Sequence, residues 1–274
     1  MKRHNFLVVV CLASLVFAAG CSASPEDDES ALGSALSASI APNSIAPNSI
    51  APNSISPGML GGAALAMGSL DASVMSAIQD PSASGASARL LLRYTVGCAL
   101  DTTQSMSFTW VDADNVSHDE TYSGVLGLAP DWASGPLAAD GQTWVSACLI
   151  ARVNYFGVTV NVSLRGPMAG LDASESELAA YTKEEGAFWG NLFTTTPTAY
   201  ACHNVPDTDH SRAAYRVCAT GYVDSSGAMQ SCGIIERLGS CSSTCGQLDS
   251  AGYYASCSDG AGPSSSSVVT VFLE

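Results

Sequence analysis

The sequence predicts an α+β fold that is mainly β, a single disulfide-stapled domain with one or two short helices, preceded by a disordered repeat spacer. Three observations indicate this class. Short segments of β-rich composition recur between turn residues after residue 85. The same region holds an even number of cysteines. A proline-containing repeat precedes it. We therefore expect four regions: a signal peptide at 1–20, a spacer at 21–58, a short helix and hinge at 59–84, and a cysteine-rich globular domain at 85–274.

The N-terminus has the pattern of a secretory signal peptide. Lys2 and Arg3 are followed by an apolar run over residues 6–19 that ends in small residues. The run is too short to cross a bilayer as a helix, which needs about 20 apolar residues. Ala18-Ala19-Gly20-Cys21 resembles the lipobox of bacterial lipoproteins, although that family usually has Leu where this chain has Ala18. The alternative is ordinary cleavage that leaves Cys21 as a free or paired thiol.

The lipobox resemblance implies a location as well as an anchor. In such proteins the cysteine is acylated and becomes the first residue of the mature chain, which here would be Cys21. Ser22 in the next position implies sorting to the outer membrane, on its periplasmic or cell-surface face. Several acyl chains on one residue give lasting attachment, whereas one chain anchors only marginally. We expect the membrane to be a partner through this lipid alone.

The charge balance excludes nucleic acid as a partner. Cleavage after residue 20 removes Lys2 and Arg3 and moves the formal charge from −15 to −17. Binding to a phosphate backbone depends on Lys and Arg side chains that replace counterions. A chain this acidic repels such polyanions. We expect no nucleic-acid partner and no cofactor.

Residues 39–58 are predicted to form a spacer with a five-residue repeat, in which SIAPN occurs three times and is followed by SISPG. The four prolines exclude a continuous helix, because each fixes φ and biases the preceding residue away from the helical region. A stacked pentapeptide solenoid would need many more repeats. Fully extended at about 3.1 Å per residue, the segment would reach about 60 Å.

The first elements after the spacer follow in order. Asp71 as N-cap and Pro81 after the end predict a short helix at 71–79. Small polar residues at 82–87 predict a hinge. Three β-rich segments then predict a strand and a hairpin whose turn is Asp112–Asn115; they are 89–100, 105–111 and 116–123.

The later elements alternate between helix and strand. Trp144, Ala147, Cys148, Ala151 and Tyr155 recur at three- and four-residue spacing, which predicts a helix at 140–155 that ends at Gly157. A capping-box pattern of Ser174 and Glu177 predicts a second helix within 172–185. Strands are predicted at 158–164, 215–220, 233–238 and 268–273.

The cysteines predict a disulfide framework. Cys11 leaves with the signal peptide and Cys21 is acylated in the lipobox interpretation, which leaves Cys98, Cys148, Cys202, Cys218, Cys232, Cys241, Cys245 and Cys257. In an exported protein we expect four bridges, although sequence alone cannot choose among about 105 pairings. Cys98 either pairs with Cys148 or joins the C-terminal tail. Zinc binding by Cys241, Cys245, His203 and His210 is disfavoured, because C-x3-C lacks a second close pair. We expect no metal site.

Two functional hypotheses remain open. The first is a non-enzymatic binding or structural domain, with Trp189, Glu185 and Asn191 as possible ligand-binding residues and a glycan or an envelope protein as partner. Trp132 and Trp144 are further candidates for a sugar platform. An exposed Trp189 is a requirement of this hypothesis.

The second hypothesis is a secreted hydrolase of glycoside hydrolase or cysteine peptidase type. A glycosidase needs two carboxyl groups about 5–9.5 Å apart. Adjacent Glu184 and Glu185 point apart on an extended chain, so Asp172 or Asp131 would have to complete the pair. A peptidase would use Cys148 with a histidine.

The acidic stretch 112–120 is more typical of a solvated hairpin tip than of a calcium loop, because it lacks the turn glycine and has Val116 at a ligand position. The lipobox, the repeat and the segments QTWVSACLIARVNYFGV, SLRG and EEGAFWGNLF together are similar to uncharacterised cysteine-rich lipoproteins of soil-dwelling Gram-negative bacteria. That resemblance implies an envelope location and no particular activity.

Overall fold

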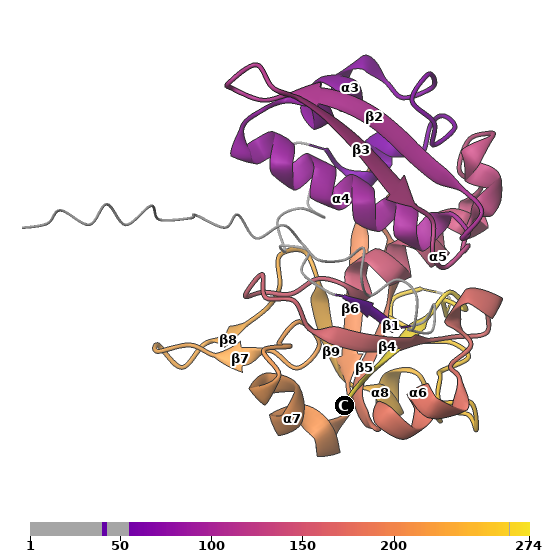
Figure 1. The fold of residues 1–274 in the computed structure, drawn as a ribbon. Coiled ribbons are helices and arrows are strands. Elements are labelled where there is room, and N and C mark those ends of the chain that lie inside the picture. The colour runs from indigo at the N-terminus through magenta and orange to yellow at the C-terminus, as the bar shows by residue number, and fades with distance from the viewer. Residues whose placement is uncertain (1–39, 43–54, 263) are drawn as a thin grey trace, which may run out of the picture. The chain divides into compact units, whose positions relative to one another are not determined.

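The computed structural model describes residues 40–42, 55–262 and 264–274 (Figure 1). The chain divides into a unit at 1–36 and a unit at 37–274, and every described residue lies in the second. The predicted signal peptide, Cys21 and most of the spacer lie outside the described residues. The α+β class is confirmed. Within the described part, no helix combines the length and apolar character that crossing a bilayer requires.

A mixed six-stranded sheet forms the centre of the fold. Its strand order is β1 (Ile40–Pro42), β4 (Asn161–Arg165), β10 (Val269–Leu273), β5 (Lys183–Asn191), β6 (Thr198–His203) and β9 (Glu236–Ser240). Only the β6–β9 pair is parallel. The predicted C-terminal strand is confirmed by β10, and β4 begins three residues later than predicted. β1 comes from the first SIAPN repeat, so three residues of the predicted spacer pair with the sheet edge.

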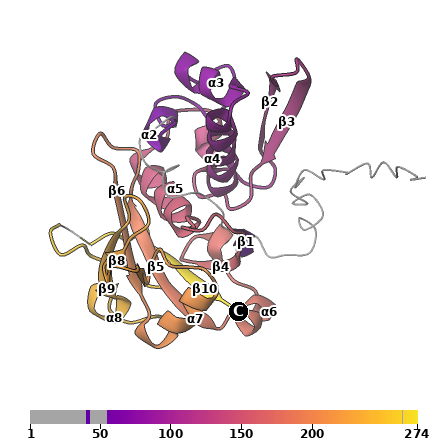
Figure 2. The same ribbon diagram turned by 90° about the vertical axis from the view of Figure 1, so that its left-hand side faces the viewer.

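Helix α5 (Ala139–Ala151) lies between the sheet and helix α4 (Ala83–Ala99) (Figure 2). The strand predicted at 89–100 and the hinge predicted at 82–87 are therefore wrong. The Oγ of Ser82 caps α4 by accepting a hydrogen bond from the N–H of Ser84 at 3.2 Å. The buried side chains recur at helical spacing at Ala88, Leu91, Leu92, Thr95, Val96 and Ala99.

The first part of the domain is a helical and hairpin layer on α4. Helix α3 (Ala72–Gln79) has the predicted cap, because Asp71 Oδ1 accepts from the N–H of Ser73 at 2.8 Å. The predicted hairpin is confirmed by β2 (Ser105–Val111) and β3 (Ser117–Ser123). The hydrophobic core begins ahead of residue 85, since it includes Ile55, Leu60, Leu65, Val74 and Ile78. A further short helix, α2 (Pro57–Leu60), precedes α3.

The remaining elements are short and lie outside the central sheet. They are α6 (Glu175–Ala180), α7 (Thr208–Ala213), β7 (Tyr222–Val223), β8 (Met229–Gln230), α8 (Cys241–Thr244) and the 3-10 turns η2 (Pro130–Ala133), η3 (Ala169–Leu171) and η4 (Val205–Asp207). Ser174 caps α6 as predicted. The helix predicted to reach residue 185 ends at Ala180, and the chain continues into β5. Residues 215–220 form turns, not the predicted strand.

All eight predicted disulfide cysteines are bridged in the structure. The pairs are Cys98–Cys148, Cys202–Cys241, Cys218–Cys232 and Cys245–Cys257. The first joins α4 to α5 and confirms one of the two alternatives for Cys98. The other three lie within the C-terminal region, where few large apolar side chains are available to stabilise the loops.

Candidate binding surface

The residues predicted to bind a ligand do not form an open site. Trp189 is only 2 % exposed and packs in the core beside Tyr200, with ring centroids 5.9 Å apart. Trp132 and Trp144 are also buried. Asn191 donates a hydrogen bond to Gln142 Oε1 at 3.2 Å. The prediction of a sugar platform at Trp189 is therefore wrong, because β5 is a central strand with side chains covered on both faces.

Glu185 forms a fully buried ion pair. Its Oε2 accepts hydrogen bonds from Arg216 Nη2 at 2.7 Å and from Arg216 Nε at 3.0 Å, and both side chains are completely inaccessible to solvent. Ser211 Oγ donates to the other oxygen at 3.2 Å. The Glu185 carboxylate therefore has a structural role and is not accessible to a ligand.

Glu184 faces different partners from Glu185, as expected for neighbours on a strand. Its two oxygens accept hydrogen bonds from the Tyr254 hydroxyl at 2.8 Å and from Asn204 Nδ2 at 3.0 Å. Burial raises the pKa of the Glu184 carboxyl, and the Tyr254 hydrogen bond opposes that rise. The two glutamates therefore cannot act across one bond, and the exposed Asp131 and Asp172 are not among the partners of either.

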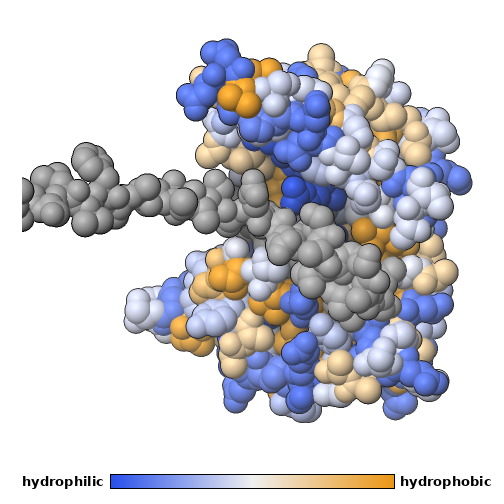
Figure 3. Space-filling view, viewed as in Figure 1, coloured by the Kyte–Doolittle hydropathy of each residue, from blue (hydrophilic) through white to orange (hydrophobic). Residues whose placement is uncertain are grey.

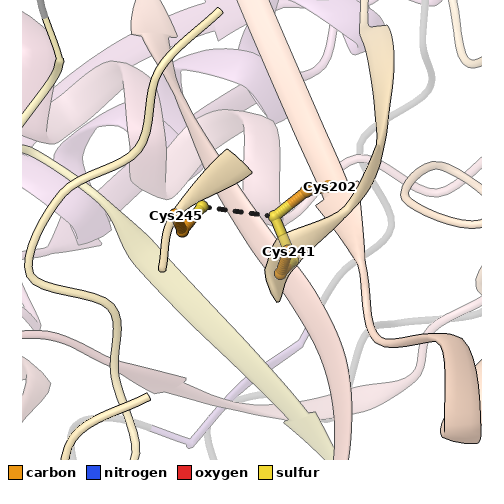
Figure 4. Close-up of side chains that lie close together, drawn as sticks. All are labelled: Cys202, Cys241 and Cys245. Carbon is orange, nitrogen blue, oxygen red and sulfur yellow. Dashed lines mark hydrogen bonds between the residues drawn. A yellow bond between two sulfur atoms is a disulfide. The ribbon is translucent and has the colours of Figure 1, made fainter. Parts of the chain in front are cut away.

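The cysteine candidates are engaged in bridges. Cys148 is bonded to Cys98, which removes the nucleophile that the peptidase hypothesis required. The sulfurs of Cys202, Cys241 and Cys245 lie within 4.8 Å of one another, but they belong to two neighbouring disulfides (Figure 4). Disulfide sulfurs are not thiolate ligands for zinc. Neither His203 nor His210 belongs to this group.

A different group of side chains has the character of a binding site. Tyr155, Phe156, Tyr215 and Tyr222 form a continuous set of ring contacts that we call the aromatic surface. Ring centroids are 5.2 Å apart for Tyr155 and Phe156, 5.1 Å for Tyr155 and Tyr222, and 5.5 Å for Phe156 and Tyr215. Tyr155 is 42 % exposed, Phe156 46 % and Tyr215 58 %. Contiguous exposed apolar rings mark interaction sites more often than isolated ones do.

Arg216 fixes the backbone on both sides of the aromatic surface. Its Nη1 and Nη2 donate to the carbonyl oxygens of Val153 and Ala151, each at 2.8 Å. These residues lead directly into Tyr155 and Phe156. Arg216 itself follows Tyr215 in the chain. The buried pair of Glu185 and Arg216 therefore anchors two separate loops that carry three of the four rings.

Local geometry determines how each ring is presented. Asn154 Oδ1 accepts from the N–H of Phe156 at 2.9 Å, and Asn154 Nδ2 donates to the carbonyl of Val158 at 2.7 Å, which turns the chain after α5. Tyr215 has a φ of 58°, a left-handed conformation that is unusual for a non-glycine residue. Such outliers cluster at functional sites.

The fourth ring is held by the β7–β8 hairpin. Tyr222 lies opposite Gln230 in that hairpin, and the disulfide between Cys218 and Cys232 closes the surrounding segment. A hydrogen bond with the Tyr155 hydroxyl raises the pKa of Tyr222 to about 12. On the face shown in Figure 3, hydrophobic and hydrophilic residues lie side by side around this hairpin.

Two features of the sequence conceal this surface. The residue spacing predicts a helix that includes Tyr155, whereas α5 ends at Ala151 because Asn154 supplies competing local hydrogen bonds. The sequence also predicts a strand that begins at Tyr215, whereas this residue lies in a turn. The adjacent rings in Asn154-Tyr155-Phe156-Gly157, a turn sequence with large aromatics at its centre, were the available signal.

A scan against protein-family models and searches among curated proteins and solved structures return no match.

Proposed function

We propose that this protein is an exported, lipid-anchored binding domain that recognises a carbohydrate through the aromatic surface. The observation that carries the proposal is the exposure of Tyr155, Phe156 and Tyr215 in mutual contact on loops anchored by a buried ion pair. A binding surface that is already rigid loses little conformational entropy when its ligand docks.

The rings of the aromatic surface are chemically suited to binding a sugar. Tyrosine offers a flat apolar face together with a hydroxyl that donates and accepts hydrogen bonds, and it orders only two side-chain torsions on binding. A pyranose ring likewise presents a C–H face and peripheral hydroxyls. The aromatic surface therefore complements both the apolar and the polar parts of such a ligand.

The side chains that a hydrolase would need are engaged in structural contacts, which favours binding over catalysis. Cys148 is bridged to Cys98, and Glu185 is paired with Arg216 out of reach of solvent. Glu184 is enclosed by Tyr254 and Asn204. These contacts account for each group by its structural role.

The proposed location rests on the N-terminal sequence and on the bridges. Acylation of Cys21 would attach the chain to the outer membrane, and the residues between Cys21 and β1 would connect the lipid to the domain. Four disulfides are typical of an oxidising compartment. Intact mass of the mature protein, before and after reduction, registers both the acyl chains and the bridges.

The binding proposal is tested on a glycan array with the full mature chain. We expect Phe156→Ala to weaken binding to the recognised glycan at least tenfold, which corresponds to about 1.4 kcal/mol. Val116→Ala removes a similarly exposed apolar side chain, 52 % exposed, from the tip of the β2–β3 turn and serves as the control. Equal binding by wild type and Phe156→Ala, with both folded by circular dichroism, would contradict the proposal.

A further inference from the structure

Three basic side chains gather beside the aromatic surface in a strongly acidic protein. His203 ends β6, Arg212 lies in α7, and Arg237 lies in β9. We call them the basic cluster. The chain has only 10 Lys and Arg residues against 25 Asp and Glu residues, so such a gathering of like charge requires a physical reason.

Gly221 brings the two guanidinium groups together. Arg212 Nε donates to the Gly221 carbonyl at 3.1 Å. A Cβ placed on Gly221 would lie 2.6 Å from Arg237 Cζ, so the Arg237 guanidinium packs directly on this residue. Gly221 also has a φ of +68°, which glycine adopts without strain. Burial and then the charges of Arg237 and Arg212 lower the pKa of His203.

Two polar atoms of the basic cluster lack hydrogen-bond partners. His203 Nδ1 and Arg237 Nε are both buried and have no hydrogen-bond partner among the described residues. Within that same part of the chain, no ion pair involves Arg237. Glu236, the preceding residue in β9, lies beside Tyr200 instead. A buried polar group left without a partner costs about 1–3 kcal/mol.

Among the described residues, one acidic side chain forms an ion pair with the cluster, and this pair is exposed. Asp209 approaches Arg212 Nη1 at 3.5 Å, but its side chain is completely exposed. Exposed pairs of this kind contribute little, because water screens them. The cluster therefore retains an excess of positive charge and unused donor capacity.

We propose that the basic cluster binds an oxyanion, phosphate or sulfate, either as the free ion or as an ester on a larger ligand. Guanidinium groups match the geometry of such oxyanions and bind them through paired hydrogen bonds. A bound anion would offset the like-charge repulsion, accept a hydrogen bond from Arg237 Nε and favour the protonated form of His203, in which both ring nitrogens donate. Buried polar atoms that have no partner within the protein commonly bind an ion or a water molecule.

The site adjoins the aromatic surface without sharing its residues. The N–H of Tyr215 donates to the Arg212 carbonyl at 3.0 Å, and Tyr222 directly follows Gly221. A carbohydrate that carries sulfate or phosphate could contact both. The inference stands independently of carbohydrate binding, because an inorganic anion needs only the basic cluster.

The test is thermal unfolding of the full mature chain in inorganic phosphate or sulfate, with chloride at matched ionic strength as reference. We expect Tm to rise with the logarithm of phosphate or sulfate concentration in wild type and in Arg93→Gln, which removes a charge from α4. We expect no such rise in Arg237→Gln. Equal Tm responses in all three proteins would mean a general salt effect and would overturn the proposal.

A second measurement does not depend on the folding of a variant. In wild type, phosphate should raise the NMR titration midpoint of His203, because a nearby anion favours the charged imidazolium. His118, which contacts Asp112 at 2.8 Å in the β2–β3 hairpin, is the internal control. A His203 midpoint that phosphate leaves unchanged would refute the site.

Two further comparisons distinguish the sources of the anion and the two proposals. Preferential binding of dextran sulfate over uncharged dextran, lost in Arg237→Gln, would assign the site to an ester on a polymer. A response to the inorganic ions alone would assign it to the free anion. Phe156→Ala should keep its phosphate response, so failure of carbohydrate binding leaves this result intact. Loss of the phosphate response in Phe156→Ala would contradict a separate site.

Discussion

The buried ion pair of Glu185 and Arg216 supports the aromatic surface from inside the protein. Arg216 reaches the carboxylate of β5 and the carbonyls of Ala151 and Val153 with one guanidinium group. A fork of donors with fixed geometry makes arginine suitable for such a junction. Lysine could not replace it, because a single ammonium group cannot reach all three acceptors in this arrangement.

Loss of the Glu185 charge should be severe. Glu185→Gln leaves the buried Arg216 without a counter-ion, so we expect the free energy of unfolding to fall by about 3–5 kcal/mol. Chemical denaturation measures this loss. Glu175→Gln, at an exposed position in the first turn of α6, is the control and should change stability by about 0.5 kcal/mol or less. A loss below about 1 kcal/mol for Glu185→Gln would contradict the structural role.

Glu184 should give the stability a recognisable pH dependence. Its raised pKa means that the folded state still binds the proton at a pH where the unfolded chain has released it. This contribution therefore weakens the fold as pH rises from the ordinary carboxyl value, about 4.3, through the raised value. Glu184→Gln cannot titrate, so its stability should gain on wild type between pH 4 and pH 7. A constant difference across that range would show that the pKa is not raised.

Local sequence patterns predict some of the secondary-structure elements but not all of them. The caps at Asp71 and Ser174 and the β2–β3 hairpin were predictable, because each depends on residues close in sequence. The segment that forms α4 predicts a strand, because its β-branched and aromatic residues mask the three- and four-residue spacing of its buried side chains. Tertiary burial between α3 and α5 overrides those propensities.

The helical assignment of α4 has a direct consequence at Leu92. This side chain is fully buried in the core that α4 shares with α3 and α5. Leu92→Ala should therefore lower the free energy of unfolding by about 2–5 kcal/mol. Leu90→Ala, at a half-buried position on the same helix, should cost distinctly less. Equal effects at the two positions would be inconsistent with one buried helical face.

The bridge between Cys218 and Cys232 should matter for binding as well as for stability. Replacing both residues with serine opens a loop with a sequence separation of 14 and should cost about 2–4 kcal/mol. Glycan affinity should fall too, because the bridge closes the segment that carries Tyr222. The matched control replaces Cys245 and Cys257, whose separation is 12 and which lie in the other core cluster. Equal losses of affinity in the two double variants would contradict this link.

The whole molecule unites a disulfide-braced α+β domain with a surface that only the tertiary structure assembles. The class and the complete bridging of the eight cysteines could be predicted, because composition and parity carry that information. The site could not. Its rings come from three segments, around Tyr155, Tyr215 and Tyr222, and the arginine that anchors the first two is itself distant from its partner Glu185 in sequence.

The most direct test of the central claim is an NMR titration of the aromatic rings with the recognised glycan. We predict that the resonances of Tyr155, Phe156, Tyr215 and Tyr222 shift together as ligand is added, while the indole N–H signals of the buried Trp132, Trp144 and Trp189 stay in place. Shifts at Trp189 with unchanged signals from Phe156 and Tyr215 would contradict the account and would place the ligand elsewhere.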